Sequence, residues 1–302
     1  MVRVKVPATS ANMGPGFDCL GVAVGLYNSM EMSECENEFY VYSPRYNKYI
    51  PGKSNNLIYR AMNKIFDECG YKPKGIMLNQ YSNIPVTRGL GSSSACIIGG
   101  MLGANVMSGR PFEYKQILNF AAEMEGHPDN VAPALYGGFC TSVMENGTVY
   151  HISNKITEPI LFAVMYPDYP VATRDSRTVV PDVFSKEDAV YNISRATLLT
   201  SALCRGKLDI LKIACDDRMH QQYRKGYITG MDDIFNISYE LGAYCTYLSG
   251  SGPTVMSIID KSNVDFSHKM NNYFANNLKD WKCTVLTIDN VGAVVCEGLR
   301  MK

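Results

Sequence analysis

The sequence predicts a protein of mixed helices and strands that is large enough for two domains, and three observations support this. The chain has 302 residues, of which 46% are hydrophobic, so it can bury a sizeable core. Stretches with apolar residues at helical spacing alternate with short strand-like runs along most of the chain. The closing segment, residues 247–298, has the order strand, helix, strand, strand, which is one half of a ferredoxin-like β-α-β layer.

The first half contains several helices and strands whose ends can be recognised. Strands are expected at 2–12, 31–43 and 74–85, helices at 55–71, 92–107 and 111–126, and a hairpin at 137–153. Gly70 and Gly126 are plausible helix stops, and a serine is expected to cap the helix that begins near Ser92. Asn146 and Gly147 form the dipeptide typical of a two-residue hairpin turn.

The second half opens with a strand and continues with helices. The strand is expected at 159–171, and the helices at 189–206, 208–217 and 231–243. The hairpin and the "NKITEP" that follows it place a domain boundary near residues 150–158. This divides the chain into a domain of residues 1–155 and a domain of residues 156–302.

Composition excludes several classes of function. Lys and Arg together number 29, as do Asp and Glu, and no long run of one charge occurs. This balance argues against a nucleic-acid binder that depends on bulk charge and against a polybasic membrane anchor. The N-terminal "MVRVKVPATSANMGPG" has no apolar core of a signal peptide, and no apolar stretch reaches the length of a membrane span. We expect a soluble, cytoplasmic protein.

The cysteines and most of the histidines carry no pattern typical of a metal site. The ten cysteines form no C-x-x-C pair, so we expect reduced, buried, small hydrophobic side chains. His151, His220 and His268 lack the spacing of metal ligands and are expected at the surface or in structural roles.

A glycine-rich stretch, "PVTRGLGSSSACIIGG" at residues 85–100, requires a reason, because glycine costs roughly 0.5–1 kcal/mol relative to alanine inside a regular element. A glycine loop that leads into a helix N-terminus presents free N–H groups and the positive end of the helix dipole, which together bind anions. A tight turn with a closely packed helix would explain the glycines without a ligand. The stretch matches neither G-x-x-x-x-G-K-[ST] nor G-x-G-x-x-G, so both explanations stay open.

Three other segments narrow the choice. "ATSANMGPGFDCLG" contains Asn12 and Asp18, "EGHPDNVAPALYGG" spans residues 125–138, and "YLSGSGPTVMSI" spans residues 247–258. With the glycine loop, they resemble the signatures of the GHMP kinases, the superfamily of galactokinase, homoserine kinase, mevalonate kinase and phosphomevalonate kinase. They stand in the family's order along essentially the whole chain. The pairing of "TSANMGPGFD" with "HPDNVAPA" is most similar to the homoserine kinases.

The resemblance implies a fold and an activity. The fold would consist of two α+β domains: an N-terminal half like domain 2 of ribosomal protein S5, and a ferredoxin-like C-terminal half. The activity would be transfer of the γ-phosphate of ATP to the hydroxyl of L-homoserine, with Mg²⁺, as a step toward threonine. A mevalonate-type kinase of the same fold and a non-catalytic ligand-binding protein remain alternatives, and the sequence leaves a homodimer open.

The resemblance also implies a nucleotide site. ATP would bind along the residues Pro85, Gly89, Leu90, Gly91, Ser92, Ser93, Ser94 and Ala95. Ser93 and Glu125 would hold Mg²⁺, an ion that prefers oxygen ligands, although the register among the three serines is ambiguous. Glu125, Asp129 and Asn130 are the candidate catalytic residues, and "HPDN" leaves the register between Asp129 and Asn130 open.

Homoserine carries an ammonium, a carboxylate and a hydroxyl, so its pocket needs groups of both charges. By the resemblance, the substrate-binding residues are Asn12, Asp18, His127, Thr173, Arg177 and Arg224. Asp18 would face the ammonium, and Arg177 and Arg224 would hold the carboxylate, since a planar fork suits two-point binding. His127 would border the substrate or, alternatively, cap helix carbonyls.

One position departs from the family pattern. "PVTR" precedes Gly-Leu-Gly-Ser-Ser, where relatives often carry another glycine, and this puts Arg88 at the edge of the loop. Arg88 would contact a phosphate or point to solvent, and we expect solvent.

Overall fold

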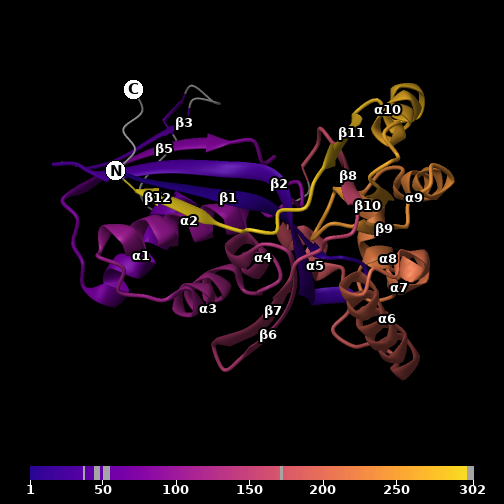
Figure 1. Ribbon diagram of the computed structural model, residues 1–302, viewed down its shortest axis with the longest axis horizontal. Coiled ribbons are helices and arrows are strands. Elements are labelled where there is room, and N and C mark those ends of the chain that lie inside the picture. Colours follow the sequence, from indigo (N-terminus) through magenta and orange to yellow (C-terminus); the bar gives the residue numbers. More distant parts are fainter. Residues whose placement is uncertain (37, 44–47, 50–54, 171–172, 298–302) are drawn as a thin grey trace.

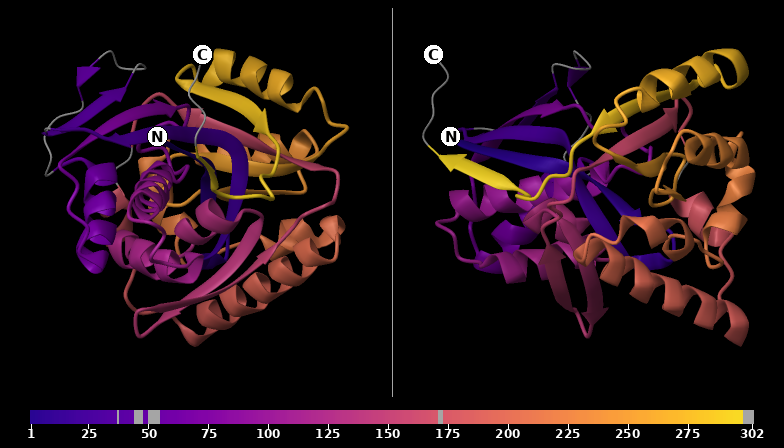
Figure 2. Two further views of the ribbon diagram at one scale, coloured as in Figure 1. Left: turned by 60° about the vertical axis from the view of Figure 1, so that its left-hand side comes forward. Right: turned by 45° about the vertical axis from the view of Figure 1, so that its right-hand side comes forward.

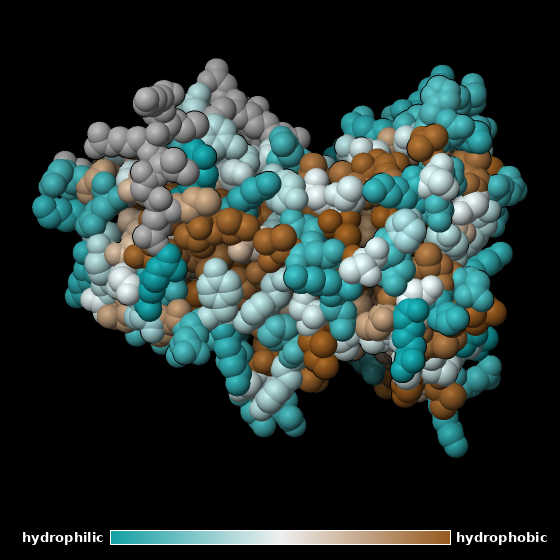
Figure 3. Space-filling model, viewed as in Figure 1, coloured by the Kyte–Doolittle hydropathy of each residue, from teal (hydrophilic) through white to brown (hydrophobic). Residues whose placement is uncertain are grey.

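The structure is a computed structural model that describes the chain except residues 37, 44–47, 50–54, 171–172 and 298–302. Two sheets form its two parts, an eight-stranded sheet at one end and a four-stranded sheet at the other (Figure 1). The space-filling view shows an indentation where the two parts meet at the top of the visible face (Figure 3). The mixed helix and strand content confirms the α+β class.

The larger sheet is built around one long strand. Its strands are β1 (Val2–Asn12), β2 (Gly16–Glu34), β3 (Glu38–Ser43), β4 (Lys48–Tyr49), β5 (Gly75–Ser82), β6 (Phe139–Glu145), β7 (Thr148–Asn154) and β12 (Val294–Glu297). Their order is β12-β1-β2-β5-β3-β4, and the β6–β7 hairpin pairs with β2. Strand β2 has 19 residues and pairs with β1 along most of its length, whereas β6 pairs with its residues 20–22 and β5 with its residues 28–34. The hairpin turns at Asn146 and Gly147, both with positive φ, which confirms that prediction.

Four helices lie beside the larger sheet: α1 (Leu57–Cys69), α2 (Ser92–Met107), α3 (Tyr114–Glu125) and α4 (Val131–Tyr136) (Figure 1). Helix α2 packs directly on the sheet. A Cβ at Gly99 would lie 1.8 Å from Cε of Met30, and one at Gly103 would lie 2.1 Å from Sδ of Met32. Close packing therefore explains the glycines inside this helix.

The ends of the first helices were partly predicted. Gly70 and Gly126, both in the left-handed conformation, end α1 and α3 as expected. The expected serine cap of α2 is wrong, because the cap is Gly91 and makes no side-chain hydrogen bond. Helix α2 begins out of a left-handed turn that glycine adopts readily.

The smaller sheet consists of β8 (Ile160–Pro167), β9 (Cys245–Leu248), β10 (Val255–Asp260) and β11 (Trp281–Leu286) in the antiparallel order β11-β8-β10-β9. Its helices are α5 (Thr173–Thr178), α6 (Lys186–Cys204), α7 (Leu211–Ala214), α8 (Gln221–Arg224), α9 (Met231–Glu240) and α10 (Phe266–Asn277), with short 3₁₀ turns at Leu208–Ile210 and Lys225–Tyr227. The strand order and the helices between strands are those of a ferredoxin-like fold.

The C-terminal segment differs from its prediction. Residues 247–260 form two strands joined by a turn, and the last strand, β12, leaves the ferredoxin-like sheet. It pairs with β1, Val2 lying opposite Glu297, so the first and last strands of the chain lie side by side (Figure 2). The chain thus crosses between the sheets twice, after β7 and after β11. The division into 1–155 and 156–302 stays a prediction.

Two other expectations can be compared with the structure. All ten cysteines are free thiols, as expected, but only four are buried, so the expectation of buried side chains is wrong for the other six. Among the described residues, no helix has the length and apolar character needed to cross a membrane.

Candidate active site

A cavity of about 380 Å³ lies where the two parts meet. Its walls include the loop before α2, the N-terminus of α2, the end of α3, the β1–β2 turn and the turn between β9 and β10. The expected site residues that line it are Asn12, Asp18, Gly89, Leu90, Gly91, Ser92, Ser93, Glu125, His127, Asp129, Asn130, Arg177 and Arg224. Three expected nucleotide-loop residues, Pro85, Ser94 and Ala95, do not line it.

The glycine loop is held by close contacts on both sides. A Cβ at Gly89 (φ 75°) would lie 2.4 Å from the carbonyl oxygen of Ser249, and one at Gly91 (φ 63°) would lie 1.9 Å from Oγ1 of Thr9. The hydroxyl of Ser249 donates a hydrogen bond of 2.5 Å to the carbonyl of Gly89, which places the 247–258 segment beside the loop. Close packing and a position at the cavity wall therefore both explain why this loop contains glycines.

Glu125 joins the end of α3 to the start of α2. The hydroxyl of Ser93 donates to Oε2 of Glu125 at 2.8 Å, and that of Ser94 donates to Oε1 at 3.1 Å. Ser93 is exposed, whereas Ser94 is fully buried. A carboxylate and an exposed hydroxyl at the cavity wall form the oxygen-donor set that suits Mg²⁺.

The expectation that Arg88 points to solvent is wrong. Its guanidinium crosses to the smaller sheet, where Nε donates to the carbonyl of Pro167 at 3.0 Å and Nη2 donates to the carbonyl of Asp168. Nη1 also donates to the carbonyl of Val86 at 3.2 Å. Because carbonyl oxygens take three donors of the guanidinium, Arg88 connects the glycine loop with the end of β8.

The β1–β2 turn presents Asn12 and Asp18 to the cavity in left-handed backbone conformations, with φ of 69° and 56°. The side chain of Asn12 accepts from the backbone N–H of Asp18 at 3.1 Å and donates to the carbonyl of Gly250 at 2.9 Å. Asn12 therefore fixes this turn internally and against the β9–β10 turn.

Asp18 is paired with Arg177. The arginine donates from Nη2 to Oδ1 at 2.7 Å and from Nη1 to Oδ2 at 3.2 Å. Burial alone would lower the pKa of Arg177. The hydrogen bonds to Asp18 and the charge of Asp18 outweigh burial, so the pKa of Arg177 is raised. The fork expected to hold a substrate carboxylate is thus occupied by a protein carboxylate.

Arg224 is only 2% exposed, although it contributes to the cavity wall. Nε donates to the carbonyl of Ser176 at 3.0 Å, and Nη1 donates to the carbonyl of Gly250 at 2.9 Å and to Nδ1 of His220 at 3.1 Å. Burial, with the neighbouring charge of Arg177, lowers the pKa of Arg224 to about 10. Since protein acceptors occupy Nε and Nη1, any substrate contact falls to Nη2.

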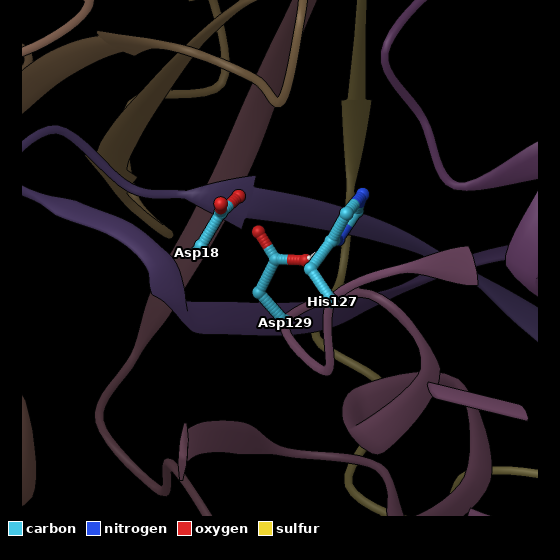
Figure 4. A group of neighbouring side chains, drawn as sticks. All are labelled: Asp18, His127 and Asp129. Atoms are coloured by element: carbon cyan, nitrogen blue, oxygen red, sulfur yellow. Dashed lines mark hydrogen bonds and ion pairs between the residues drawn. The ribbon is translucent and has the colours of Figure 1, made fainter. Parts of the chain in front are cut away.

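His127, Asp129 and Asp18 come together at the cavity (Figure 4). One ligand atom of each lies within 4.8 Å of the others. Nδ1 of His127 is hydrogen-bonded to Oδ1 of Asp129, which is buried. Burial opposes the charge of His127, but the hydrogen bond and charge of Asp129 outweigh it and raise the pKa of His127.

Asn130 completes this corner and faces β1. Its Oδ1 accepts from the hydroxyl of Thr9 at 2.7 Å, and its Nδ2 donates to Oδ1 of Asp129 at 3.4 Å. Asn130 thus supports Asp129 and ties it to the strand under the glycine loop. The remaining expected residue, Thr173, begins α5, and its side chain lies outside the described residues.

Sequence reasoning missed part of the cavity wall. Asn55, Asn56, Leu57, Ile58, Gln80, Ser82, Gly250 and Ser251 also line it. Gly250 and Ser251 belong to the "YLSGSGPTVMSI" segment, which gave a usable signal. The others come from the start of α1 and the end of β5, where nothing in the local sequence distinguishes a cavity wall from an ordinary helix or strand end.

Comparisons with known proteins match this architecture. Residues 56–138 match the model of the GHMP kinases N terminal domain, and residues 199–276 match that of the GHMP kinases C terminal. The homoserine kinase of Clostridium beijerinckii is 43% identical over 303 residues, which cover 99% of this chain and 100% of that protein. The homoserine kinase of Caldicellulosiruptor bescii is 42% identical over 297 residues, covering 98% and 97%.

Solved structures match as well. The crystal structure of homoserine kinase from Cytophaga hutchinsonii superposes with a TM-score of 0.85 at 25% identity, covering 98% of this chain and 97% of that one. A mevalonate kinase structure with a TM-score of 0.73 and 16% identity, covering 95% of this chain and 99% of that one, shares the fold. The chain belongs to the GHMP kinase family, whose members named here are ATP-dependent phosphotransferases. Within that family it belongs with the homoserine kinases, which it matches along almost its full length.

Proposed function

We propose that the protein transfers the γ-phosphate of ATP to the side-chain hydroxyl of L-homoserine, giving O-phospho-L-homoserine on the way to threonine. The observation that carries this proposal is one cavity with two unlike sides. One side has the glycine loop and a helix N-terminus, which favour anionic phosphates. The other has Asp18, Arg177 and Arg224, which offer charges of both signs for an amino acid.

ATP binding is assigned to the loop and the first turn of α2. We assign the phosphates to residues 89–93, and Mg²⁺ to Ser93 and Glu125, whose oxygens suit that ion. When bound, Mg²⁺ neutralises charge on the transferred phosphate and its neighbour. The close packing of Gly89 and Gly91 holds the backbone N–H groups in place before the substrate arrives.

Homoserine binding requires a rearrangement of charge at Asp18. The ammonium would take over part of the hydrogen bonding that Arg177 now supplies to this carboxylate, and the freed guanidinium would turn to the substrate carboxylate. Nη2 of Arg224 would add a second contact from a fixed direction. His127 would border the same pocket.

Catalysis on this proposal consists of positioning and electrostatic stabilisation. The transition state of phosphoryl transfer is loose, so the attacking hydroxyl keeps its proton until late and needs little help from a base. Asp129 already bonds His127 and lies against Asn130. We assign Asp129 the role of fixing this corner of the pocket.

The cytoplasmic location expected from the sequence stays a prediction.

The test is a coupled assay of ADP release over homoserine, serine, threonine, mevalonate and galactose. We expect homoserine to be turned over far better than mevalonate or galactose, because mevalonate has no ammonium for Asp18 and galactose has no carboxylate for the arginines. Equal or better activity on either would favour a mevalonate-type or sugar kinase. ATP and homoserine binding without ADP release would favour a non-catalytic protein.

A further inference from the structure

His220 is a fully buried histidine that lies behind the substrate side of the cavity and does not line it. It precedes the short helix α8, which ends at Arg224. Its Nδ1 lies 3.1 Å from Nη1 of Arg224, and its Nε2 lies 2.8 Å from the carbonyl oxygen of Gly14. His220 thus joins the arginine to the β1–β2 turn that carries Asn12 and Asp18.

These two contacts fix the protonation of the ring. A guanidinium has only donors, so Nδ1 must be the acceptor in its hydrogen bond with Arg224. A carbonyl oxygen only accepts, so Nε2 must carry the hydrogen that is donated to Gly14. His220 is therefore neutral, with its proton on Nε2.

The complete burial of the ring agrees with its neutral state. Burial is the largest effect and lowers the pKa of His220, and the charge of Arg224 lowers it further. The charges of Asp217 and Asp18 and the hydrogen bond to Gly14 act in the opposite direction without outweighing burial. Oδ2 of Asp217 lies 3.8 Å from Nε2, but it accepts from the backbone N–H groups of His220 and Gln221. Asp217 therefore binds the backbone at the start of α8, and the ring nitrogens of His220 bind Arg224 and Gly14.

We propose that neutral His220 is a positioning residue for the acceptor substrate: it holds the guanidinium of Arg224 and the 12–18 turn in one fixed arrangement. The inference rests on the proposed role of Arg224 in the substrate pocket. Nη1 of Arg224 is shared between His220 and Gly250, and Nε is bound to Ser176. Without the histidine acceptor, Nη1 loses one of its two hydrogen-bond partners. The guanidinium can then rotate, and Nη2 points in a different direction in the cavity.

Two substitutions separate the contacts of the ring. Asparagine places an amide oxygen near the position of Nδ1, and glutamine places an amide nitrogen near that of Nε2. His220→Asn therefore keeps the acceptor for Arg224, whereas His220→Gln keeps the donor to Gly14. We expect His220→Gln to raise KM for homoserine roughly ten- to hundredfold, the range for losing a hydrogen bond to a charged group, with KM for ATP little changed. His220→Asn should stay within a few-fold of wild type.

A double-mutant cycle tests whether His220 acts through Arg224. Arg224→Met alone should raise KM for homoserine, and His220→Gln should add nothing in that background. Additive effects would overturn the inference, and so would equal KM values for the Asn and Gln variants, or an unchanged KM in Arg224→Met. Thermal unfolding of each variant shows whether it is folded, and ¹⁵N NMR of wild-type His220 should show the proton on Nε2 even if a variant fails to fold.

The same experiment distinguishes this inference from the proposed function. If homoserine is not phosphorylated, the proposed function fails, and the cycle is measured with the alcohol that the assay shows to be the best substrate. If homoserine is phosphorylated but the cycle is additive, the inference about His220 fails and the kinase assignment stands. A ring with its proton on Nδ1 would also overturn the inference, whatever the substrate.

Discussion

At the scale of single residues, the cavity is organised by charges that protein groups already share. Arg177 gives both arms of its fork to Asp18, and His127 is bound to Asp129. Such pairs keep partly buried charges compensated before a substrate arrives, since an uncompensated buried charge is costly. On the proposed function, the substrate would exchange partners with these protein groups, so KM would be sensitive to each member of a pair.

Arg177→Met should raise KM for homoserine strongly while KM for ATP changes little. Arg177 lies on the side of the cavity assigned to homoserine, and its removal leaves Asp18 without its ion-pair partner. Steady-state kinetics with each substrate varied in turn measure this. Arg218→Met is the matched control, since Arg218 forms ion pairs with Glu187 and Asp188 and does not line the cavity. An unchanged KM for homoserine in Arg177→Met would assign this arginine a structural role only.

Asp129→Asn tests whether a general base exists. We expect this variant to keep substantial kcat, because the amide oxygen can still accept from His127, whereas Glu125→Gln should lose most of its kcat by removing a charge from the proposed Mg²⁺ site. Both are measured at saturating ATP and homoserine with excess Mg²⁺. The pKa of His127, followed by NMR, should also fall in Asp129→Asn, because Asp129 is what raises it.

A general base typically contributes about 10²–10⁴-fold to the rate. A loss of kcat greater than about a hundredfold in a correctly folded Asp129→Asn protein would therefore identify Asp129 as the base. It would also exclude the mechanism by positioning alone.

At the scale of elements, the glycine loop is a segment clamped between three neighbours. Gly91 lies against Thr9 of β1, Gly89 lies against Ser249 in the β9–β10 turn, and Arg88 reaches the carbonyls that end β8. The loop follows β5 of the larger sheet along the chain, but residues of both sheets hold it in place. Its geometry therefore depends on how the two sheets are packed.

Gly89→Ala should raise KM for ATP and lower the melting temperature, because the new Cβ would lie 2.4 Å from a carbonyl oxygen that cannot easily move. Gly109→Ala is the matched control, since Gly109 also has a positive φ (84°) but no neighbouring atom within 4 Å. That variant should show only the backbone strain, of order 1–2 kcal/mol, with unchanged kinetics. Equal loss of stability and an unchanged KM for ATP in both would contradict the clamp.

At the scale of the whole molecule, the two parts are interlocked by the path of the chain. Strand β12 returns to pair with β1, and on the way Thr287 accepts from the backbone of Gly25 at 2.8 Å and Asp289 accepts from that of Gly138 at 2.7 Å. The larger sheet is therefore complete only with residues 294–297, which form β12. The boundary near residue 155 is therefore crossed by strand pairing, because β12 belongs to the sheet of the first half.

A fragment of residues 1–155 should not unfold cooperatively at the temperature of the full chain, because the edge of β1 that pairs with β12 would be exposed. Circular dichroism during heating measures this. The control is the full chain cleaved within residues 155–159, in which both pieces are present and should stay associated and active. A fragment that melts like the full chain would show that residues 1–155 form an independent domain.

The sequence by itself determined several of the elements and the family. Helix α1 with its stop at Gly70, helix α3 with its stop at Gly126, and the hairpin turn at Asn146 and Gly147 were all predictable. The reason is that apolar periodicity, helix caps and turn residues act over a few positions. The motifs around Asp18, Gly89 and Asp129 identified the family for a similar reason, since each is a short, contiguous pattern.

Only the tertiary structure decided which of these residues meet. Asp18 and Arg177 are 159 positions apart, Arg88 and Pro167 are 79 apart, and His220 and Gly14 are 206 apart. No local pattern encodes such pairs, because an arginine can be satisfied by any carboxylate or carbonyl that packing brings near it. The pairing of β12 with β1 could not be predicted for the same reason, since the alternation of residues in a strand does not specify which other strand it pairs with.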